Sequence, residues 1–399
     1  MLRRRCLSLV VVLGTLSAVW INLPVDGRAA TSAEPSPSAA IGPDIEATAK
    51  LLGVSVDEAT YRIKIQQEVG VLEAALNADL HDVLGSVWIT QEPQFGVHVS
   101  VLPGYEKLVQ PYLSKTDLEP ITTISDARRS LSTLRDEALA FLDSNPSFGN
   151  YDLSIDEIAG YIDVVAPSKE ALDQLDIPRA SVTNQMLNDF QFDPGVLAQA
   201  ADVIGGRIIS DVHFCTAGFV VRTDNGNQDG VADAGHCDNA GQVWNNSVNL
   251  TFQEQAFASD HDVQWFTTPG VDDKPWFNAG DGGSIRHVLS LTGRANTSIG
   301  DVVCKYGVTA GYHCGEVIHK DVCPGYVPGC YPDFIQADTG GTDMCLGGDS
   351  GGPVFYDTSA YGMVSGDAGD ADHDCIYMAI NFVTGSVVNP SIHVRIAAS

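Results

Sequence analysis

At residues 347–353 the chain reads GGDSGGP, which places Ser350 among four glycines. A serine that attacks a substrate needs a backbone that turns sharply and aims two N–H groups at a developing oxyanion. Glycine permits such conformations and leaves room for a substrate. We therefore predict that Ser350 is a nucleophile. The alternative interpretation is a glycine-rich turn with an incidental serine.

Two further motifs supply the groups that such a serine needs. His236 lies in AGHC, residues 234–237, and an imidazole is the usual base near neutral pH. A buried carboxylate that orients the imidazole would complete the set. Asp262 begins an apolar run within DHDVQW, residues 260–265, which would carry it inward. Asp260 is the competing candidate. The resulting chain order, His, Asp, Ser, is one of the known orders for such a triad.

The composition fits a globular protein that does not bind polyanions. Hydrophobic residues make up 44% of the 399 residues, enough to bury a core. Acidic residues number 51 against 22 basic ones, for a formal net charge of -29. Such a chain lacks the basic surface that neutralises phosphates. We therefore expect neither nucleic acid nor, after removal of a signal, a membrane as partner.

The chain divides into three regions that differ in composition and in predicted secondary structure. Residues 1–30 are typical of a secretory signal peptide, with a basic start, an apolar run and small residues beyond it. An uncleaved membrane anchor is the alternative. Residues 31–200 begin with a linker rich in Ser, Pro and Ala and continue with mixed helix and strand patterns, typical of a small α+β domain. From 201 to 399, short β-rich runs between turn residues favour an all-β sandwich or barrel.

Local patterns predict elements within the second region, residues 31–200. Ser55 followed by Glu58 is a capping box at the start of a helix. Strands are expected at 87–90 and 97–101, paired around a Glu92-Pro93 turn. Apolar spacing predicts two amphipathic helices, whose inward positions are Val69, Leu72, Leu76 and Leu80 in the first and Leu131, Leu134, Ala138 and Phe141 in the second.

The cysteines indicate export. Beyond Cys6 in the signal, all lie in the second half: Cys215, Cys237, Cys304, Cys314, Cys323, Cys330, Cys345 and Cys375. Their even number indicates a disulfide framework in an oxidising compartment. We therefore expect a secreted, extracellular protein. Zinc is the competing interpretation, but no pair has the short gap of a structural zinc knuckle, and we predict no metal site.

The three motifs AGHC, DVQW and GDSGGP resemble, in this order, those of the chymotrypsin-like serine proteases, in their bacterial secreted streptogrisin and alpha-lytic branch. The resemblance covers residues 201–399 and implies an all-β domain of two six-stranded antiparallel β-barrels with the active site between them. Residues 31–200 resemble, more weakly, the pro-regions of that branch, which aid folding and block the site until removed. The implied activity is that of a serine endopeptidase on protein or peptide substrates, with no cofactor.

The resemblance also implies roles for single residues. The backbone N–H groups of Gly348 and Ser350 would form the oxyanion hole, and Ser365 would support the catalytic aspartate. Asp349 would form a buried ion pair with Lys305, whose alternative is a solvated surface charge. The implied disulfides are Cys215–Cys237, Cys304–Cys314 and Cys345–Cys375, which leaves Cys323 and Cys330 to close the loop at 324–329.

Substrate preference rests on several acidic residues. Asp343 lies two residues before Cys345, where animal trypsins carry the aspartate that binds Arg or Lys, although the length of the following loop, from Cys345 to Ser350, differs from the trypsin pattern by one residue. Ser365, Gly366 and Asp367 match the strand that lines the substrate, with Asp367 in place of a glycine. Further acids stand before Cys375: Asp370, Asp372 and Asp374. We expect a preference for a basic residue before the cut. The alternative is an acidic surface loop outside the pocket.

Two departures from the family pattern leave other functions open. Asp233 stands where the family has Thr, close to the triad, and the spacing from His236 to Asp262 is short. These features are the support for an inactive homologue that binds peptides or proteins. An esterase with the same triad fits the sequence less well, because the esterase fold needs alternating strands and helices and a different chain order of the triad residues. Residues 225–233 match the start of a calcium loop but lack its final acid; an extended hairpin tip is the alternative.

Overall fold

The computed structural model describes residues 41–114, 116–145, 152–166, 180–182, 202–210, 213–280, 284–369, 373–385 and 391–397. The predicted signal peptide, most of the predicted linker and the predicted boundary at residue 200 lie outside these ranges, as do Asp370 and Asp372. No helix within the described ranges is long and apolar enough to span a membrane.

The N-terminal region begins with two helices, α1 (Ile41–Leu51) and α2 (Val56–Leu80). The Ser55 hydroxyl caps α2 by accepting a hydrogen bond from the Glu58 N–H at 3.2 Å, as the capping box predicts. Three of the predicted inward positions, Val69, Leu72 and Leu76, are buried. Because these positions recur every three or four residues, they form one face, which packs against the sheet that follows.

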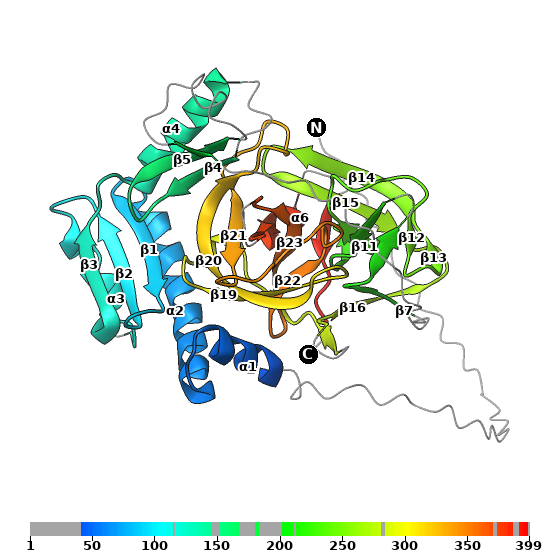
Figure 1. Cartoon of the computed structure of the whole chain (residues 1–399), viewed down its shortest axis with the longest axis horizontal. Coiled ribbons are helices and arrows are strands. Elements are labelled where there is room, and N and C mark those ends of the chain that lie inside the picture. Colours follow the sequence, from blue (N-terminus) through cyan, green and yellow to red (C-terminus); the bar gives the residue numbers. More distant parts are fainter. Residues whose placement is uncertain are drawn as a thin grey trace, which may run out of the picture. The chain divides into compact units, whose positions relative to one another are not determined.

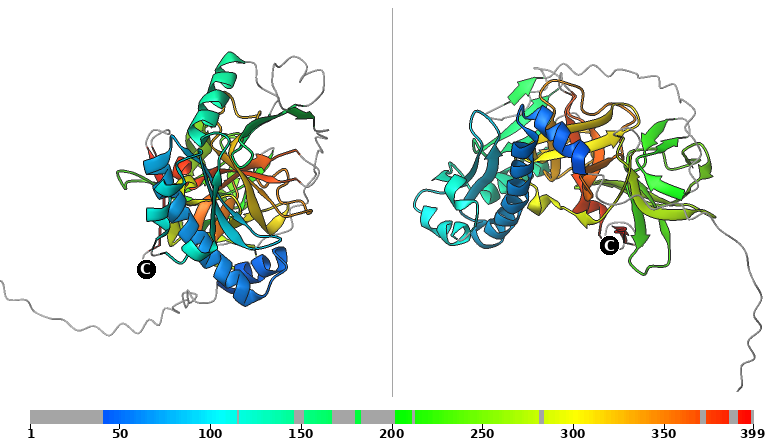
Figure 2. Two further views of the ribbon diagram at one scale, coloured as in Figure 1. Left: turned by 90° about the vertical axis from the view of Figure 1, so that its left-hand side faces the viewer. Right: turned by 90° about the horizontal axis from the view of Figure 1, so that it is seen from below.

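That sheet has three strands. The predicted hairpin forms from β1 (Leu84–Thr90) and β2 (Gly96–Val101), and β3 (Thr122–Asp126) joins β2 in parallel. Figure 2 shows α2 beside these strands in both views. The short helical elements are η2 (Glu106–Leu108), α3 (Gln110–Leu113) and η3 (Glu119–Ile121). The second predicted helix is α4 (Leu131–Ser144), capped by Ser130. The region is α+β, as predicted.

The C-terminal half contains one closed barrel of six antiparallel strands (Figure 1). Its order is β19-β22-β23-β24-β21-β20, and β20 pairs back onto β19 to close the ring. β22 and β24 are buried at every residue, because one strand face lines the barrel and the other is covered by neighbouring elements. The strands are β19 (Val302–Gly307), β20 (Gly311–Cys323), β21 (Phe334–Asp338), β22 (Pro353–Tyr356), β23 (Ser359–Asp367) and β24 (Cys375–Ala379).

The other barrel is built from strands between residues 202 and 287 and from the C-terminal strand β25 (Ile392–Val394). Its strands form three sheets, ordered β14-β15-β11-β10-β25, β13-β12-β8-β9 and β17-β16-β7. They are β7 (Asp202–Gly205), β8 (Ile208–Ser210), β9 (Phe214–Thr216), β10 (Val220–Thr223), β11 (Asp229–Asp233), β12 (Val243–Trp244), β13 (Val248–Asn249), β14 (Thr251–Ala258), β15 (His261–Thr267), β16 (Asp272–Asn278) and β17 (Ile285–His287).

The predicted all-β class with two barrels is confirmed, with one difference. Within the described residues, only the second barrel forms a single closed ladder; the first is divided into three sheets around its own core. Trp244 is fully buried in that core, and its indole N–H donates to the Ile204 carbonyl at 3.0 Å. This bond fixes β7, at the start of the β-rich half, to the barrel interior. The remaining short elements are β18 (Ser290–Leu291), η4 (Arg294–Asn296) and α6 (Ile380–Val383).

The N-terminal region extends the sheet of the second barrel. The strands β4 (Asp152–Asp156), β5 (Tyr161–Ala166) and β6 (Ala180–Val182) follow one another beside β20 (Figure 1). β4 pairs antiparallel with the end of β20, with Ser154 opposite Val322 and Leu153 opposite Cys323. The edge of β20 beyond the barrel is therefore covered by strands from the other half of the chain.

Candidate active site

Three side chains that are far apart in the sequence meet where the two barrels face each other. His236 follows β11, Asp262 is the second residue of β15, and Ser350 lies in the turn before β22. The His236 Nε2 atom lies 3.0 Å from the Ser350 hydroxyl oxygen, and its Nδ1 atom lies 2.9 Å from Asp262 Oδ2. A hydroxyl is thus hydrogen-bonded to a base, and a carboxylate orients that base.

The geometry separates the two candidate carboxylates. Asp262 is fully buried and accepts three hydrogen bonds: from the His236 backbone N–H at 2.9 Å, from the ring, and from the Ser365 hydroxyl at 2.6 Å. Asp260 instead pairs with its neighbour His261. Only Asp262 therefore lies in the position that the sequence motif proposes for the third group. The short spacing from His236 does not prevent this arrangement.

Burial and neighbouring charge have opposite effects on the pKa of the His236 imidazole. Removal of the His236 ring from water lowers its pKa, but the charge and the hydrogen bond of Asp262 raise it, and the net result is a pKa above the ordinary value. An imidazole with this environment is stabilised when it takes up a proton. It is thus suited to hold the proton that a serine loses on attack.

The loop that carries Ser350 is fixed by a buried ion pair. Lys305 Nζ lies 2.7 Å from Asp349 Oδ2, and both side chains are fully buried. Asp349 also accepts backbone N–H bonds from Thr309 at 2.8 Å and from Leu346 at 3.1 Å. Burial lowers the pKa of Lys305, which the carboxylate counteracts. The structure therefore places Lys305 inside the protein beside Asp349, and not on the surface.

Two backbone N–H groups next to the serine point away from the chain's own acceptors. Within the described residues, neither the Gly348 N–H nor the Ser350 N–H donates a hydrogen bond to another group of the protein. Gly348 has a φ of 98°, and a Cβ atom there would lie 2.2 Å from the Phe214 ring, so glycine is required. The two N–H groups are those that the resemblance assigns to an oxyanion hole.

Thr216 of the first barrel holds this loop from the opposite side. Its hydroxyl donates to the Gly348 carbonyl at 2.8 Å, and its backbone N–H donates to the Ser350 carbonyl at 2.8 Å. Both bonds cross from β9 to the loop that precedes β22. Sequence reasoning missed Thr216. Its position beside Cys215, whose disulfide partner follows His236, is the only signal that could have pointed to it.

Tyr326 is a second residue that sequence reasoning missed. It lies in the loop closed by Cys323 and Cys330, and its hydroxyl donates to Ser365 Oγ at 2.9 Å. Its ring meets the His236 ring edge-on at 6.1 Å, and a Cβ atom at Gly366 would lie 2.7 Å from the phenol oxygen. The aromatic ring therefore occupies space that a larger residue 366 would need. A single tyrosine in a loop closed by a disulfide was the available signal.

Among the acidic residues proposed for substrate preference, those that the structure describes do not gather at one point. Asp343 is exposed. Asp367, at the end of β23, has a carboxylate oxygen 3.7 Å from His373 Nδ1. Asp374 is buried and accepts a hydrogen bond from the Gln336 amide at 2.9 Å. Of these, Asp367 is the one that follows Ser365 and Gly366 directly on the strand beside the triad.

The eight cysteines are joined in four pairs. Three are the pairs that the resemblance implies, Cys215–Cys237, Cys304–Cys314 and Cys345–Cys375, and the fourth joins the two remaining cysteines, Cys323 and Cys330. The first pair ties the residue after His236 to β9. The last ties the approach to Ser350 to β24. Cross-links of this kind stabilise a fold by about 2–4 kcal/mol each.

The segment with a calcium-loop pattern is a hairpin between β10 and β11. Asn225 accepts hydrogen bonds from the Thr223 hydroxyl at 2.8 Å and from the Asn227 N–H at 3.0 Å. Asp229 is paired with Arg222 at 2.5 Å and with Arg395 at 2.9 Å. A carboxylate held by two guanidinium groups is a weak ligand for a cation. The contacts favour the hairpin interpretation.

Comparisons with known proteins match both halves of the chain. Streptogrisin-C of Streptomyces griseus is 31% identical over 182 residues, covering 43% of this chain and 36% of that protein. Serine protease 1 of Rarobacter faecitabidus is 24% identical over 377 residues, covering 90% of this chain and 65% of that protein. The chain thus spans less than two thirds of the length of either relative. The solved structure of Thermobifida fusca Protease A aligns with a TM-score of 0.41 and 27% identity, over 49% of this chain and 100% of that one. No protein-family model matches the sequence.

The hydrogen bond from Asp262 predicts how the His236 pKa responds to substitution. In a Ser350→Ala background, Asp262→Asn should lower the His236 pKa by about one pH unit or more, because a charge within hydrogen-bonding distance is lost. Titration of the histidine ring protons by NMR measures this. Asp260→Asn is the matched control and should leave the His236 pKa unchanged. Equal responses in the two variants would contradict the assignment.

Proposed function

The second half of this chain is homologous to the bacterial chymotrypsin-like serine proteases of the streptogrisin type, and from this kinship we propose that the protein is a secreted serine endopeptidase made as a zymogen. The observation that carries the proposal is the continuous set of hydrogen bonds from Ser350 through His236 to Asp262. Export is supported by the signal-like N-terminus and by the four disulfides of the C-terminal half.

The proposed reaction uses only groups of the chain. Ser350 Oγ attacks the carbonyl carbon of a peptide bond while His236 Nε2 takes the hydroxyl proton. The N–H groups of Gly348 and Ser350 bind the negative oxygen of the tetrahedral intermediate. His236 then gives its proton to the amine nitrogen, the C–N bond breaks, and an ester to Ser350 remains. Water, deprotonated by His236, cleaves this ester and restores the serine.

A fluorophosphonate probe tests the nucleophile directly. The secreted, processed protein should gain the mass of one probe less HF, because the serine oxygen displaces fluoride from phosphorus, and peptide mapping should place the label on Ser350. His236→Ala should abolish the labelling while the circular dichroism spectrum stays the same. A folded, processed protein that takes up no probe would instead support the other candidate, an inactive homologue that binds peptides or proteins.

We assign the N-terminal region the role of a pro-region that aids folding and inhibits the enzyme. Its match to Serine protease 1 extends along most of this chain, well beyond the β-rich half. The described part of the region also contacts the second barrel extensively. On α2, Gln66 exchanges two hydrogen bonds with the backbone of Val302, at 2.8 and 3.0 Å, and Glu73 pairs with Lys320 and accepts from Ser298 at 2.6 Å.

Buried charges join the two halves. Asp44 on α1 accepts both guanidinium N–H groups of Arg286, at 2.6 and 2.9 Å, and both side chains are fully buried. Asp44 also accepts from the Tyr312 hydroxyl and from the Asp357 N–H, each at 2.6 Å. On α4, Arg135 pairs with Asp321 and lies 2.7 Å from Asp333. Such pairs specify one docked arrangement, because each partner left alone would be a costly buried charge.

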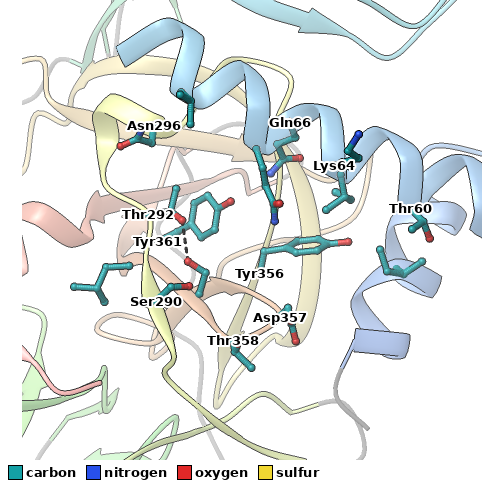
Figure 3. A pocket seen from close by; sticks show the side chains of 16 residues that line it. Thr60, Lys64, Gln66, Ser290, Thr292, Asn296, Tyr356, Asp357, Thr358 and Tyr361 are labelled. Carbon is teal, nitrogen blue, oxygen red and sulfur yellow. Dashed lines mark hydrogen bonds between the residues drawn. The ribbon is translucent and has the colours of Figure 1, made fainter. Parts of the chain in front are cut away.

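The contact surface is nevertheless incompletely packed, which suits a separable region. A cavity of about 520 Å³ lies between α2 and the strands of the second barrel (Figure 3). Polar side chains line much of it, among them Lys64 and Gln66 of α2 and Tyr361 of β23. The pocket is open to solvent along one side, where the Lys64 side chain is exposed, so water reaches the seam between α2 and the barrel. The seam therefore resembles an interface between domains more than a continuous core.

We propose that the processing cut lies at Ala200-Ala201 and not at the Ile204–Gly206 neighbourhood. Residues 202–205 form β7, which pairs with β16. A Cβ atom at Gly205 would lie 1.9 Å from the Gly218 carbonyl oxygen, so this backbone is closely packed. A cut within β7 would break a buried strand, whereas a cut before it leaves the barrel intact.

The Asp44 pair yields a stability prediction for the full chain carrying Ser350→Ala, which prevents self-cleavage. Asp44→Asn should destabilise the docked region by about 3–5 kcal/mol, because Arg286 then remains buried without a counter-charge. The midpoint of urea unfolding measures the effect. The double variant Asp44→Leu, Arg286→Met is the control and should lose less than the single one. An unchanged midpoint in Asp44→Asn would contradict the role assigned to this pair.

The preference for a basic residue before the cut remains a proposal, supported by Asp367 at the end of the substrate strand β23. Matched peptides that differ only in Arg, Phe or Glu at that position should show the highest kcat/KM for Arg. Asp367→Asn should then reduce the advantage of Arg over Phe by about tenfold, the size of one lost charge-assisted hydrogen bond. Equal rates for the three peptides in the unmodified protein would exclude the preference.

A further inference from the structure

Asp233 is a fully buried carboxyl group immediately beside the triad. It ends β11, three residues before His236. Its Oδ1 atom accepts a hydrogen bond from the Ala234 N–H at 2.8 Å. A Cβ atom at Gly351, the residue after Ser350, would lie 2.0 Å from that same oxygen. The carboxyl group therefore packs directly against the loop that carries the nucleophile, but within the described residues its Oδ2 atom has no hydrogen-bond partner.

A second buried acceptor without a partner lies directly across the sheet. Gln264 on β15 is the register partner of Asp233, so the two side chains project from the same face. Its amide nitrogen donates to the carbonyls of Cys237 at 3.1 Å and Asp238 at 3.3 Å, which fixes the orientation of the amide. The amide oxygen Oε1 is then buried and, among the described residues, without a donor.

Two adjacent buried acceptors that both lack a donor point to a missing proton. A carboxylate has only acceptor oxygens, whereas a carboxylic acid has one O–H donor. A proton on Asp233 Oδ2 would let the acid donate to Gln264 Oε1 and would satisfy both atoms at once. It would also remove a negative charge from the immediate neighbourhood of Asp262.

The surroundings favour the neutral form. Burial raises the pKa of Asp233 well above its ordinary value, and the Asp262 carboxylate adds to this effect; the Ala234 N–H, the positive form of His236 and the polar Gln264 side chain oppose it without reversing it. The carboxylate oxygen also lies within 4.8 Å of the sulfur atoms of Cys215 and Cys237, which form a disulfide and carry no charge. In the adjoining loop, the charge of Asp349 is already paired with Lys305.

We propose that Asp233 is a positioning residue that works as a neutral carboxylic acid, bonded through its proton to Gln264 and through its carbonyl oxygen to the Ala234 N–H. In this form it connects β11, β15 and the loop of Ser350 without placing a second negative charge beside the triad. Its role in activity rests on the proposed protease function, whereas its protonation does not. Ionisation of Asp233 at alkaline pH would leave its carboxylate facing the Gln264 amide oxygen, with no donor between them, and would weaken the contacts that hold His236 in position.

Asp233→Asn is the matching variant. Asparagine keeps an oxygen for the Ala234 N–H and offers an N–H donor to Gln264, but it cannot ionise. At neutral pH its kcat should stay within about threefold of the unmodified protein, the effect of altering one neutral hydrogen bond. Its kcat should persist at alkaline pH where that of the unmodified protein falls. A large loss of kcat at neutral pH, together with a shifted acid limb, would show that the charged form is needed and would overturn the proposal.

Stability gives a readout that is independent of activity, in proteins carrying Ser350→Ala. The unfolded chain ionises Asp233 above about pH 4, but the folded protein keeps the proton, so folding is disfavoured progressively as pH rises above that value. The urea midpoint of Asp233→Asn should therefore exceed that of its parent at neutral pH, and the gap should close toward pH 4. If the Ser350→Ala parent were instead more stable than its Asp233→Asn variant at neutral pH, Asp233 would be ionised and would stabilise the fold, which contradicts the proposal.

Infrared difference spectroscopy detects the protonation state of Asp233 directly. The spectrum of Ser350→Ala minus that of Ser350→Ala, Asp233→Asn at neutral pH should contain the carbonyl stretch of a protonated carboxyl group. Bands from all other carboxyl groups cancel in the difference. Only the antisymmetric stretch of a carboxylate in that difference would overturn the proposal. If both the band and the stability gap appear but the unmodified protein takes up no fluorophosphonate, the protonated acid stands and the protease function fails.

Discussion

The site depends on one buried carboxylate. Asp262 is withdrawn from water, and three donors converge on its carboxylate: two from His236 and one from Ser365. The first two come from the first barrel and the third from the second. The same three bonds therefore hold the base in position and join the two barrels. The bond from Tyr326 to Ser365 extends this network to the loop closed by Cys323 and Cys330.

Two of the buried acids are each matched by a buried opposite charge. Asp349 has Lys305, and Asp44 has Arg286, each pair fully enclosed. One pair fixes the loop of the nucleophile, and the other fixes the N-terminal region on the second barrel. Asp233 is the contrasting case, since no cation lies in hydrogen-bonding contact with it among the described residues. The solution that the geometry supports there is a proton in place of a counter-ion.

The sequence carries most information where the signal is local. The glycines around Ser350 and the apolar run after Asp262 mark positions whose neighbours in the chain also determine their surroundings. The same holds for the α2 cap at Ser55 and for the hairpin of β1 and β2. Fold class followed from strand length and turn frequency, because these depend on residues a few positions apart.

What the sequence could not reveal depends on contacts between distant segments. Thr216 and Tyr326 carry no motif, and each is recognised only once the barrel brings it next to the Ser350 loop or the His236 ring. The pairing of β4 with β20 joins residues that lie far apart in the chain. The first barrel's division into three sheets is likewise set by packing around Trp244 and not by local pattern.

The central claim is that the carboxylate network makes Ser350 a working nucleophile beside a formed oxyanion hole. A crystal structure of the processed protein with a peptide boronate tests it most directly. The account predicts a covalent bond from Ser350 Oγ to a tetrahedral boron, with one boron-bound oxygen within hydrogen-bonding distance of the Gly348 and Ser350 N–H groups. A boronate that lies unbonded in the cleft, with His236 turned away from Ser350, would contradict it.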